Sequence, residues 1–111
     1  MRKDDQIRLR HMLDAAHEAV AFTQGRKRAD LDTDRMLALS LVKEIEIIGE
    51  AANQIAETSR EQLPEIPWAD IIGMRNRLVH AYFDINLEIL WQTVEQDLPP
   101  LIRALERVLK G

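Results

Sequence analysis

The residues best suited to chemistry lie in one short segment, GMRNRLVHAYFD at residues 73–84. Arg75, Arg77, His80 and Tyr82 all fall within it. Histidine can exchange a proton near neutral pH, and arginine is a permanent cation whose planar guanidinium matches a phosphate group. Together these groups suit cleavage of an RNA phosphodiester, in which the ribose 2′-hydroxyl is the nucleophile and no metal is required.

From the residue types alone, a structural explanation of the same cluster is the simpler one. His80 and Tyr82 could cap a buried helix through their polar tips, while Arg75 and Arg77 pair with acidic residues of a neighbouring element. The residue types alone do not separate this interpretation from the chemical one.

The spacing of Arg75 and His80 limits how they could act together. On a regular helix, residues five apart differ by roughly 140° around the axis and about 7.5 Å along it. The two side chains could meet if the helix unwinds near His80, if the arginine stem curls around the helix, or if a two-fold dimer apposes two copies. Asn76, four residues before His80, could orient the imidazole ring.

The elements that must position this cluster are predicted to be helices. Apolar residues recur at intervals of three and four, and the chain has only 4 glycines and 4 prolines, which is typical of an all-α protein. Its 111 residues fit a single domain over residues 1–111. We expect an antiparallel bundle of four to five helices. The first runs from about Asp4 to Phe22, and the second from capping residues Asp30, Asp32 and Thr33 to about Ile55. The others run from Pro67 to about Val79, from Asp84 or Asn86 to about Gln96, and from Asp97 to about Lys110.

Several details of these helices can also be predicted. Gly25 suits a left-handed turn after the first helix. A buried seam on the second helix is expected to include Leu37, Leu41, Ile45, Ile48, Ala52 and Ile55, and the small residues near Gly49 should let a neighbouring helix approach closely. Residues 58–67 read as a linker, and the helix after Pro67 should be largely buried. The last two helices could form one kinked helix, because Pro99 removes a backbone hydrogen bond.

Composition and motifs exclude several other classes of function. The chain has no cysteine, no histidine preceded by glutamate three residues earlier, and no glycine-rich phosphate loop, so we expect neither a metal site nor a cofactor. The formal net charge of -4 means that any RNA contact must be local. The first residues lack the apolar run of a signal peptide and no stretch is long enough to span a bilayer, so we expect a cytoplasmic protein without a membrane partner.

Other conspicuous residues have simpler explanations. The basic run at residues 26–28 is expected to be a solvated loop, although it could add to a basic rim. Trp68 and Trp91 fall on apolar stripes and should pack in the core or in a dimer interface rather than stack on bases. His11 and His17 should lie at the surface of the first helix.

The cluster resembles the signature of the HepT-like toxins of the HEPN superfamily, which are partners of minimal nucleotidyltransferase (MNT) antitoxins. The signature is an arginine, four residues, a histidine, one residue and a tyrosine, and here it reads Arg75 through His80 to Tyr82. The stretches Ile47–Ala52, Ile66–Trp68 and Tyr82–Asn86 are also similar to the family, so the resemblance covers nearly the whole chain.

The resemblance implies an all-helical homodimer that cleaves RNA without metal at a composite cleft. Arg75 would bind the scissile phosphate, His80 would act as general acid or base, and Asn76 and Arg77 would support the site. Tyr82 would carry AMP attached by the nucleotidyltransferase, which places a bulky anion two residues from the histidine and would block the cleft.

Two other functions remain open from the sequence. The chain could be a catalytically silent helical dimer that binds a nucleotide or docks a nucleotidyltransferase. It could also be a structural dimerisation module, in which case the motif would face a packed core.

Overall fold

The computed structural model of the chain describes residues 1–81 and 84–110, and the side chains of all of these except residues 80 and 81. The elements follow one another as α1 (Lys3–Phe22), α2 (Asp30–Thr33), α3 (Arg35–Gln54), α4 (Glu57–Glu61), α5 (Trp68–Leu78), β1 (Val79–Ala81), β2 (Asp84–Ile85), α6 (Leu87–Gln92), a π-helical segment (Thr93–Asp97) and α7 (Leu98–Lys110).

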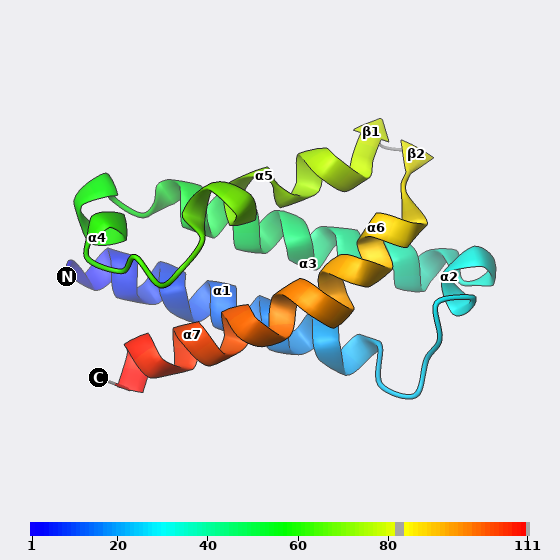
Figure 1. Cartoon of the computed structure of the whole chain (residues 1–111), viewed down its shortest axis with the longest axis horizontal. Helices are drawn as coiled ribbons and strands as arrows, with labels where there is room; N and C mark the ends of the chain where they lie inside the picture. Colours follow the sequence, from blue (N-terminus) through cyan, green and yellow to red (C-terminus); the bar gives the residue numbers. More distant parts are fainter. Residues whose placement is uncertain (82–83, 111) are drawn as a thin grey trace.

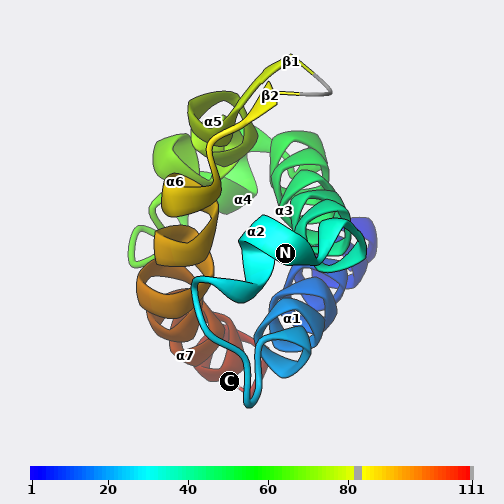
Figure 2. The ribbon, with the colours of Figure 1, turned by 90° about the vertical axis from the view of Figure 1, so that its right-hand side faces the viewer.

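The long helices form a bundle, as the sequence predicted. Helices α1 and α3 lie side by side and run in opposite directions, and α5 lies against α3 (Figure 1). Helix α6, the π-helical segment and α7 form one arm that returns along the bundle and packs against α1. Seen from one end, α1 and α3 occupy one side of the bundle, while α5, α6 and α7 occupy the other (Figure 2).

The core lies between these helices and matches the predicted apolar stripes. Because apolar residues recur at helical spacing on α1 and α3, each helix turns one continuous stripe inward. The predicted seam of α3 is confirmed, since its members are all buried: Leu37, Leu41, Ile45, Ile48, Ala52 and Ile55. The arm formed by α6 and α7 closes the core with Leu90, Leu98 and Leu105, which are fully buried.

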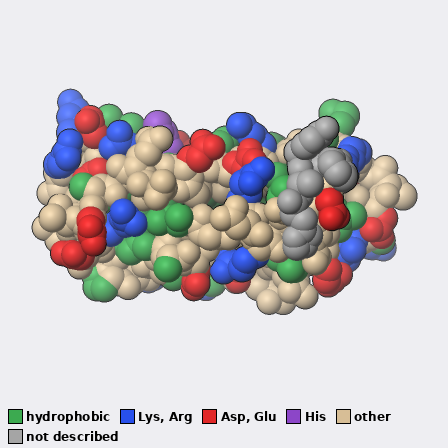
Figure 3. All heavy atoms as spheres, turned by 90° about the horizontal axis from the view of Figure 1, so that it is seen from above, with side chains coloured by type: hydrophobic (Ala, Val, Ile, Leu, Met, Phe, Trp, Pro, Cys, Tyr) green, Lys and Arg blue, Asp and Glu red, His purple; other side chains and the backbone are tan. Residues whose placement is uncertain are grey.

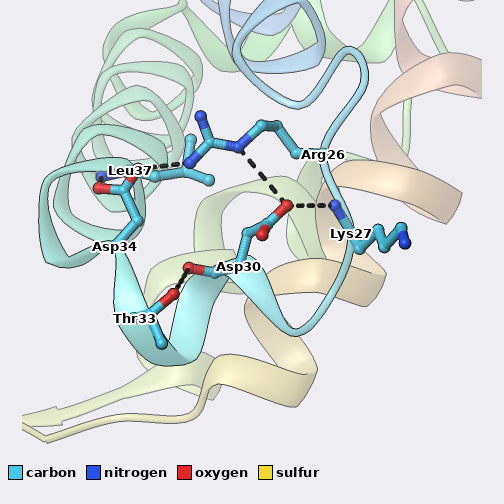
Figure 4. A network of polar contacts seen from close by, with 6 residues as sticks. All are labelled: Arg26, Lys27, Asp30, Thr33, Asp34 and Leu37. Atoms are coloured by element: carbon cyan, nitrogen blue, oxygen red, sulfur yellow. Dashed lines mark hydrogen bonds and ion pairs between the residues drawn. The ribbon is translucent and has the colours of Figure 1, made fainter.

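The start of α3 differs from the prediction. Asp34 caps the helix, because its Oδ1 accepts a hydrogen bond of 3.0 Å from the backbone N–H of Leu37. Residues 30–33, which were expected to supply the cap, instead form the one-turn helix α2. Asp30 accepts a hydrogen bond from the backbone N–H of Lys27, and Arg26 forms ion pairs with Asp30 and Asp34 (Figure 4). These contacts tie the turn around residues 25–30, where Gly25 adopts the predicted left-handed φ of 72°, to the start of α3.

The helix that carries the motif is more exposed than predicted. Of the residues of α5, only Ile71, Met74 and Leu78 are buried, so the expectation of a largely buried helix is wrong. The helix packs closely on α3 at Gly49, where a Cβ would lie 3.5 Å from the carbonyl oxygen of Ile71. Close packing along one side leaves the polar side of α5 at the surface.

A short hairpin follows α5 and was not predicted. Strands β1 and β2 pair antiparallel, with Val79 opposite Ile85 and Ala81 opposite Asp84. At the base of the hairpin, the backbone N–H of Asn86 donates a 2.7 Å hydrogen bond to the carbonyl of Leu78. The Asn86 side chain accepts a 3.0 Å hydrogen bond from the backbone N–H of Ile89, so Asn86 rather than Asp84 caps α6. The all-α prediction therefore holds for the bundle but missed these strands.

The last two predicted helices form one continuous arm, which was the alternative expectation. The π-helical turn at Thr93–Asp97 joins α6 to α7, and Pro99 lies in the first turn of α7. Proline has no N–H and crowds the preceding turn of a regular helix. The wider π-helical turn lies where this crowding would occur.

The predicted linker at residues 58–67 begins within the short helix α4, which is anchored to α1. The Ser59 hydroxyl donates a 2.6 Å hydrogen bond to Asp5, and the backbone N–H of Ala56 donates a 3.3 Å hydrogen bond to the same carboxylate. The Trp68 indole then donates to the carbonyls of Arg60 and Leu63, at 3.1 Å each. Among the described residues, no helix has the length and apolar character needed to cross a bilayer.

Candidate functional site

The polar side of α5 faces a shallow groove that it shares with α3. From α5 the groove is lined by Ile72, Arg75 and Asn76, and from α3 by Glu46, Gly49, Glu50 and Asn53. Its volume is about 160 Å³. Because Gly49 has no side chain, the two helices lie close together. The polar residues on either side of this contact form the rim of the groove.

Arg75 is anchored to α3 through one nitrogen. Its Nε donates a 2.5 Å hydrogen bond to Oε2 of Glu46, and the Arg75 side chain is 42% exposed. The two terminal nitrogens of the guanidinium have no hydrogen bond to any of the described residues. These are the atoms that form paired hydrogen bonds to a phosphate, so Arg75 is held in place with its phosphate-binding edge available.

The charges around Arg75 are mixed rather than basic. Glu46 and Glu50 line the same groove, and Lys43 lies 4.0 Å from Glu46. On the face of the molecule that carries α3 and α5, basic and acidic side chains are interspersed and form no continuous basic surface (Figure 3). Among the described residues of this groove, Arg75 is the one fixed cation, and the mixed charges around it give little general attraction for an RNA backbone.

Arg77 lies on the other side of α5 from Arg75. It donates a 3.1 Å hydrogen bond to the backbone carbonyl of Asp70 and lies 3.8 Å from the Asp70 carboxylate. It also lines a separate hollow of about 560 Å³ between α5 and α7, together with Arg107. The structure thus brings Arg75 and Asn76 together in one groove and places Arg77 apart from them.

The two remaining motif residues fall at the edge of the described structure. The backbone of His80 belongs to β1, while its side chain and the whole of Tyr82 lie outside the described residues. Since α5 ends at Leu78, the backbone follows the first of the three routes considered for bringing Arg75 and His80 together, which is loss of the helix before the histidine. Because His80 belongs to β1, Asn76 and His80 do not share a helical face, and a role for Asn76 in orienting the imidazole stays a prediction.

The other conspicuous residues play structural parts. Arg26 pairs with Asp30 and Asp34, while Arg28 pairs with Asp32 and with Glu88 of α6. These pairs occupy both arginines of the basic run and tie the loop before α2 to its neighbours. Both tryptophans are partly buried and pack against the core, as predicted: Trp68 and Trp91. The two α1 histidines are exposed, as predicted: His11 and His17.

Sequence reasoning allowed for an acidic partner of Arg75 on a neighbouring element but did not identify it as Glu46 of α3. Glu46, Glu50 and Asn53 follow one another at intervals of four and three on α3, which places them on one face beside the buried seam. That spacing was visible in the sequence, but nothing in it indicated that α5 would pack against this face. Among the described residues, no three histidine, aspartate or glutamate side chains are grouped as a metal site would require.

Comparisons with known proteins show the family to which the chain belongs. The family described as Ribonuclease HepT-like matches residues 12–108. A provisionally named ribonuclease HepT of Thermococcus cleftensis is 32% identical over 110 residues, which cover 99% of this chain and 100% of the relative. A provisionally named RNase of Methanocaldococcus jannaschii is 32% identical over 107 residues, covering 96% of this chain and 98% of the relative.

A third relative extends the range of organisms. A provisionally named RNase of Caldanaerobacter subterraneus subsp. tengcongensis is 32% identical over 102 residues, covering 92% of this chain and 91% of the relative. No solved structure matches the chain significantly. Because the family match and these relatives span nearly the whole chain, the chain belongs to the Ribonuclease HepT-like family.

Proposed function

We propose that the chain is a metal-independent endoribonuclease of a single domain, residues 1–111, and the toxin of a pair whose antitoxin is an MNT-type nucleotidyltransferase. Membership of the Ribonuclease HepT-like family supports the reaction class. The observation that carries the proposal is the state of Arg75, which is fixed by Glu46 through Nε while its terminal nitrogens remain available at an exposed groove.

The proposed reaction uses the RNA itself as the nucleophile. Arg75 binds the scissile phosphate through its two terminal nitrogens and stabilises the charge that builds on the phosphate oxygens. His80 takes the proton of the ribose 2′-hydroxyl, whose oxygen attacks phosphorus while the bond to the 5′-oxygen of the next nucleotide breaks. The leaving 5′-oxygen takes a proton from water, so the products are a 2′,3′-cyclic phosphate and a free 5′-hydroxyl. Asn76 supports Arg75 in the groove, and Arg77 has a secondary role.

The proposed active form is a homodimer with a composite cleft. Among the described groove residues, one copy presents one fixed cation, Arg75, beside Glu46 and Glu50, which binds a polyanion weakly. A second copy supplies a second arginine and further surface to the cleft. The antitoxin inactivates the enzyme by attaching AMP to Tyr82, two residues from His80, where an anionic nucleotide excludes the RNA backbone.

Cleavage assays on matched variants test the proposal. A short RNA is incubated with the purified protein in EDTA, and Arg75→Ala and His80→Ala are compared with Arg103→Ala, which removes an exposed arginine of α7. The first two variants should lose at least ~100-fold in rate, and Arg103→Ala should keep the parent rate. Equal rates for all three variants would overturn the assignment.

The acidic residues of the groove favour a second candidate function. Glu46 and Glu50 beside Arg75 weaken binding of a polyanion, which fits a catalytically silent dimer that binds a nucleotide or docks a nucleotidyltransferase. In that case the parent protein would cleave no RNA and its expression would not arrest growth. Coexpression with the nucleotidyltransferase, followed by mass spectrometry, tests Tyr82 separately: the parent should gain AMP and Tyr82→Phe should not.

A further inference from the structure

Two carboxyl groups are buried among the described residues, and their surroundings differ. Asp5 is 1% exposed and accepts hydrogen bonds from the Ser59 hydroxyl and from the backbone N–H of Ala56. Glu44 of α3 is 4% exposed, and its Oε2 atom is buried with no hydrogen-bond partner among the described residues. Burying a carboxylate without donors is costly, so Glu44 cannot be held as a carboxylate in the way that Asp5 is.

A second carboxyl lies beside Glu44 on the neighbouring helix. Helices α1 and α3 run side by side (Figure 1), and residues of these two helices alone line a hollow of about 410 Å³ between them. Glu44 lines it from α3, and Glu18, which is exposed, lines it from α1. The two carboxyls therefore meet where the helices pack.

Other charged groups near the hollow do not neutralise this pair. Lys43 is the one cation among the residues that line the hollow, and its ion pair is with Glu46, at 4.0 Å. On α1, Asp14 and His17 lie close to Glu18 in sequence but do not line the hollow, and His17 lies 3.7 Å from Glu106 of α7. Within the described part of the chain, Glu44 thus has an acidic neighbour and no ion-pair partner.

A single proton resolves the conflict between the two carboxyls. Two carboxylates can only accept hydrogen bonds, whereas a protonated carboxyl donates one through its O–H. Ionisation of both groups at one site is disfavoured by their repulsion. Burial, together with hydrogen bonding and repulsion from Glu18, raises the pKa of Glu44 to about 7. Glu44 is accordingly the member of the pair that carries the proton.

We propose that Glu44 and Glu18 hold one proton between them up to neutral pH, and that this hydrogen bond is a pH-sensitive link between α1 and α3. With the proton in place, neutral Glu44 donates to the Glu18 carboxylate. Loss of the proton leaves two negative charges at the same contact, one of them buried, and weakens the packing of the two helices. The link is separate from the groove at Arg75 and does not depend on RNA cleavage.

The link stabilises the fold at low pH and is lost at high pH. The unfolded chain releases the Glu44 proton at the ordinary pKa of 4.5, whereas the folded chain retains it to a pKa of about 7. The stabilisation is therefore complete below the ordinary value and disappears as the pH rises through the raised one. From these two values, the equilibrium constant for unfolding should rise about tenfold between pH 6 and pH 8.

Carbon-13 NMR of the full chain, with labelled glutamate side chains, detects the proton directly. In the parent, one glutamate carboxyl should titrate with a midpoint near pH 7, and its signal should be missing from Glu44→Gln. Glu18→Gln should lower this midpoint by at least ~1 pH unit, because the repulsion is removed and the new amide can donate to Glu44. A Glu44 carboxyl that titrates at its ordinary value in the parent would overturn the proposal.

Urea denaturation at several pH values tests the effect on stability. Glu44→Gln retains a donor for Glu18 but cannot ionise, so the tenfold rise in the unfolding constant should be absent. Glu95→Gln changes an exposed glutamate outside the hollow and should keep the rise. Replacing all three histidines with glutamine should also keep it, which separates Glu44 from the other groups that titrate near neutral pH. The same pH dependence in Glu44→Gln and in the parent would contradict the link.

Amide hydrogen exchange locates the effect in the bundle. Protection of the amides of α1 and α3 around Glu18 and Glu44 should fall between pH 6 and pH 8 by more than the change in intrinsic exchange rates. Glu44→Gln, shown by circular dichroism to be folded, should abolish this additional fall. An undiminished fall in that variant would show that another group controls the contact between the two helices.

Discussion

The Nε atom of Arg75 lies 2.5 Å from Oε2 of Glu46, so the guanidinium of α5 is bound to α3 by the nitrogen that a phosphate does not need. Glu46 is 24% exposed and lies at the edge of the contact between the two helices. We therefore regard Glu46 as a positioning residue for Arg75, one that also places a negative charge near the phosphate position of the proposed reaction.

Two substitutions of Glu46 separate these effects. Glu46→Gln keeps an oxygen that can accept from Arg75 but removes the charge, so KM for RNA should fall about fivefold while kcat changes little, because about 1 kcal/mol of repulsion is removed. Glu46→Ala removes the anchor as well and should lower kcat. Steady-state kinetics on a short RNA give both constants. Equal effects of the two substitutions on kcat would contradict a positioning role.

Arg75 and Arg77 should contribute unequally to cleavage. Arg75 lines the groove on α3, whereas Arg77 pairs with Asp70 on the other side of α5. Arg77→Ala should therefore keep activity within about tenfold of the parent, whereas Arg75→Ala should lose ~100-fold or more. Single-turnover rates measure the difference. A larger loss for Arg77→Ala would show that the RNA lies on the α7 side.

Gly49 should tolerate a methyl group but nothing larger. A Cβ at this position meets the backbone carbonyls of Ile71 and Ile72 at 3.5 and 3.7 Å, which are ordinary contacts. Gly49→Ala should leave stability unchanged or raise it by up to about 1 kcal/mol, because alanine favours the helix. Gly49→Leu should separate α3 from α5 and lower stability. Urea denaturation compares them, and a large loss in Gly49→Ala would contradict the stated packing.

Asn86 should be important at the end of the hairpin. Its side chain caps α6 and its backbone N–H bonds to Leu78 at the end of α5. Asn86→Ala should cost about 1 kcal/mol, since only the cap is lost. Asn86→Asp retains an accepting oxygen and is the matched control, which should stay close to the parent. Thermal denaturation measures both, and equal losses would indicate that the amide has another partner.

The stability of the bundle should depend on pH through Asp5. The hydrogen bond from Ser59 chiefly lowers the pKa of Asp5 below its ordinary value of 3.8, aided by the backbone N–H of Ala56. A lowered pKa means that the folded state favours the carboxylate. The resulting stabilisation is complete above the ordinary value and is lost as the pH falls through the lowered one.

Ser59→Ala should therefore destabilise the protein most near neutral pH. The difference from the parent should shrink as the pH falls through the lowered pKa of Asp5, below which the carboxyl is protonated in both folded and unfolded chains. Urea denaturation at several pH values measures it, and Thr58→Ala, which removes an exposed hydroxyl of the same helix, is the control. A difference that does not change with pH would contradict the role of the Asp5 carboxylate.

The parts of the fold that depend on periodicity could be predicted from the sequence. The seam from Leu37 to Ile55 is buried as predicted, because the helical spacing of apolar residues indicates which side of a helix faces the core. A helix cap depends instead on a single residue, and several residues near the start of α3 have side chains that could serve as the N-cap. Asp34 caps the N-terminus of α3 because residues 30–33 form a separate helical turn.

The surroundings of the motif depended on contacts between distant segments and could not be predicted. Glu46 and Arg75 are 29 residues apart, and their meeting requires that α5 pack on α3 at Gly49. The hairpin likewise pairs only three residues with two, too few to leave an alternating pattern in the sequence. Arg75 was identified by its chemistry, whereas its partner was a consequence of packing.

The small size of the groove at Arg75 bears on which RNAs the enzyme would accept. Pockets that enclose an entire small ligand usually measure about 300–1,000 Å³, and this groove measures about 160 Å³. It is therefore smaller than a pocket that encloses a whole nucleotide. Discrimination among nucleotides would then involve surfaces outside the groove, and in the homodimer proposed above these surfaces include the second copy.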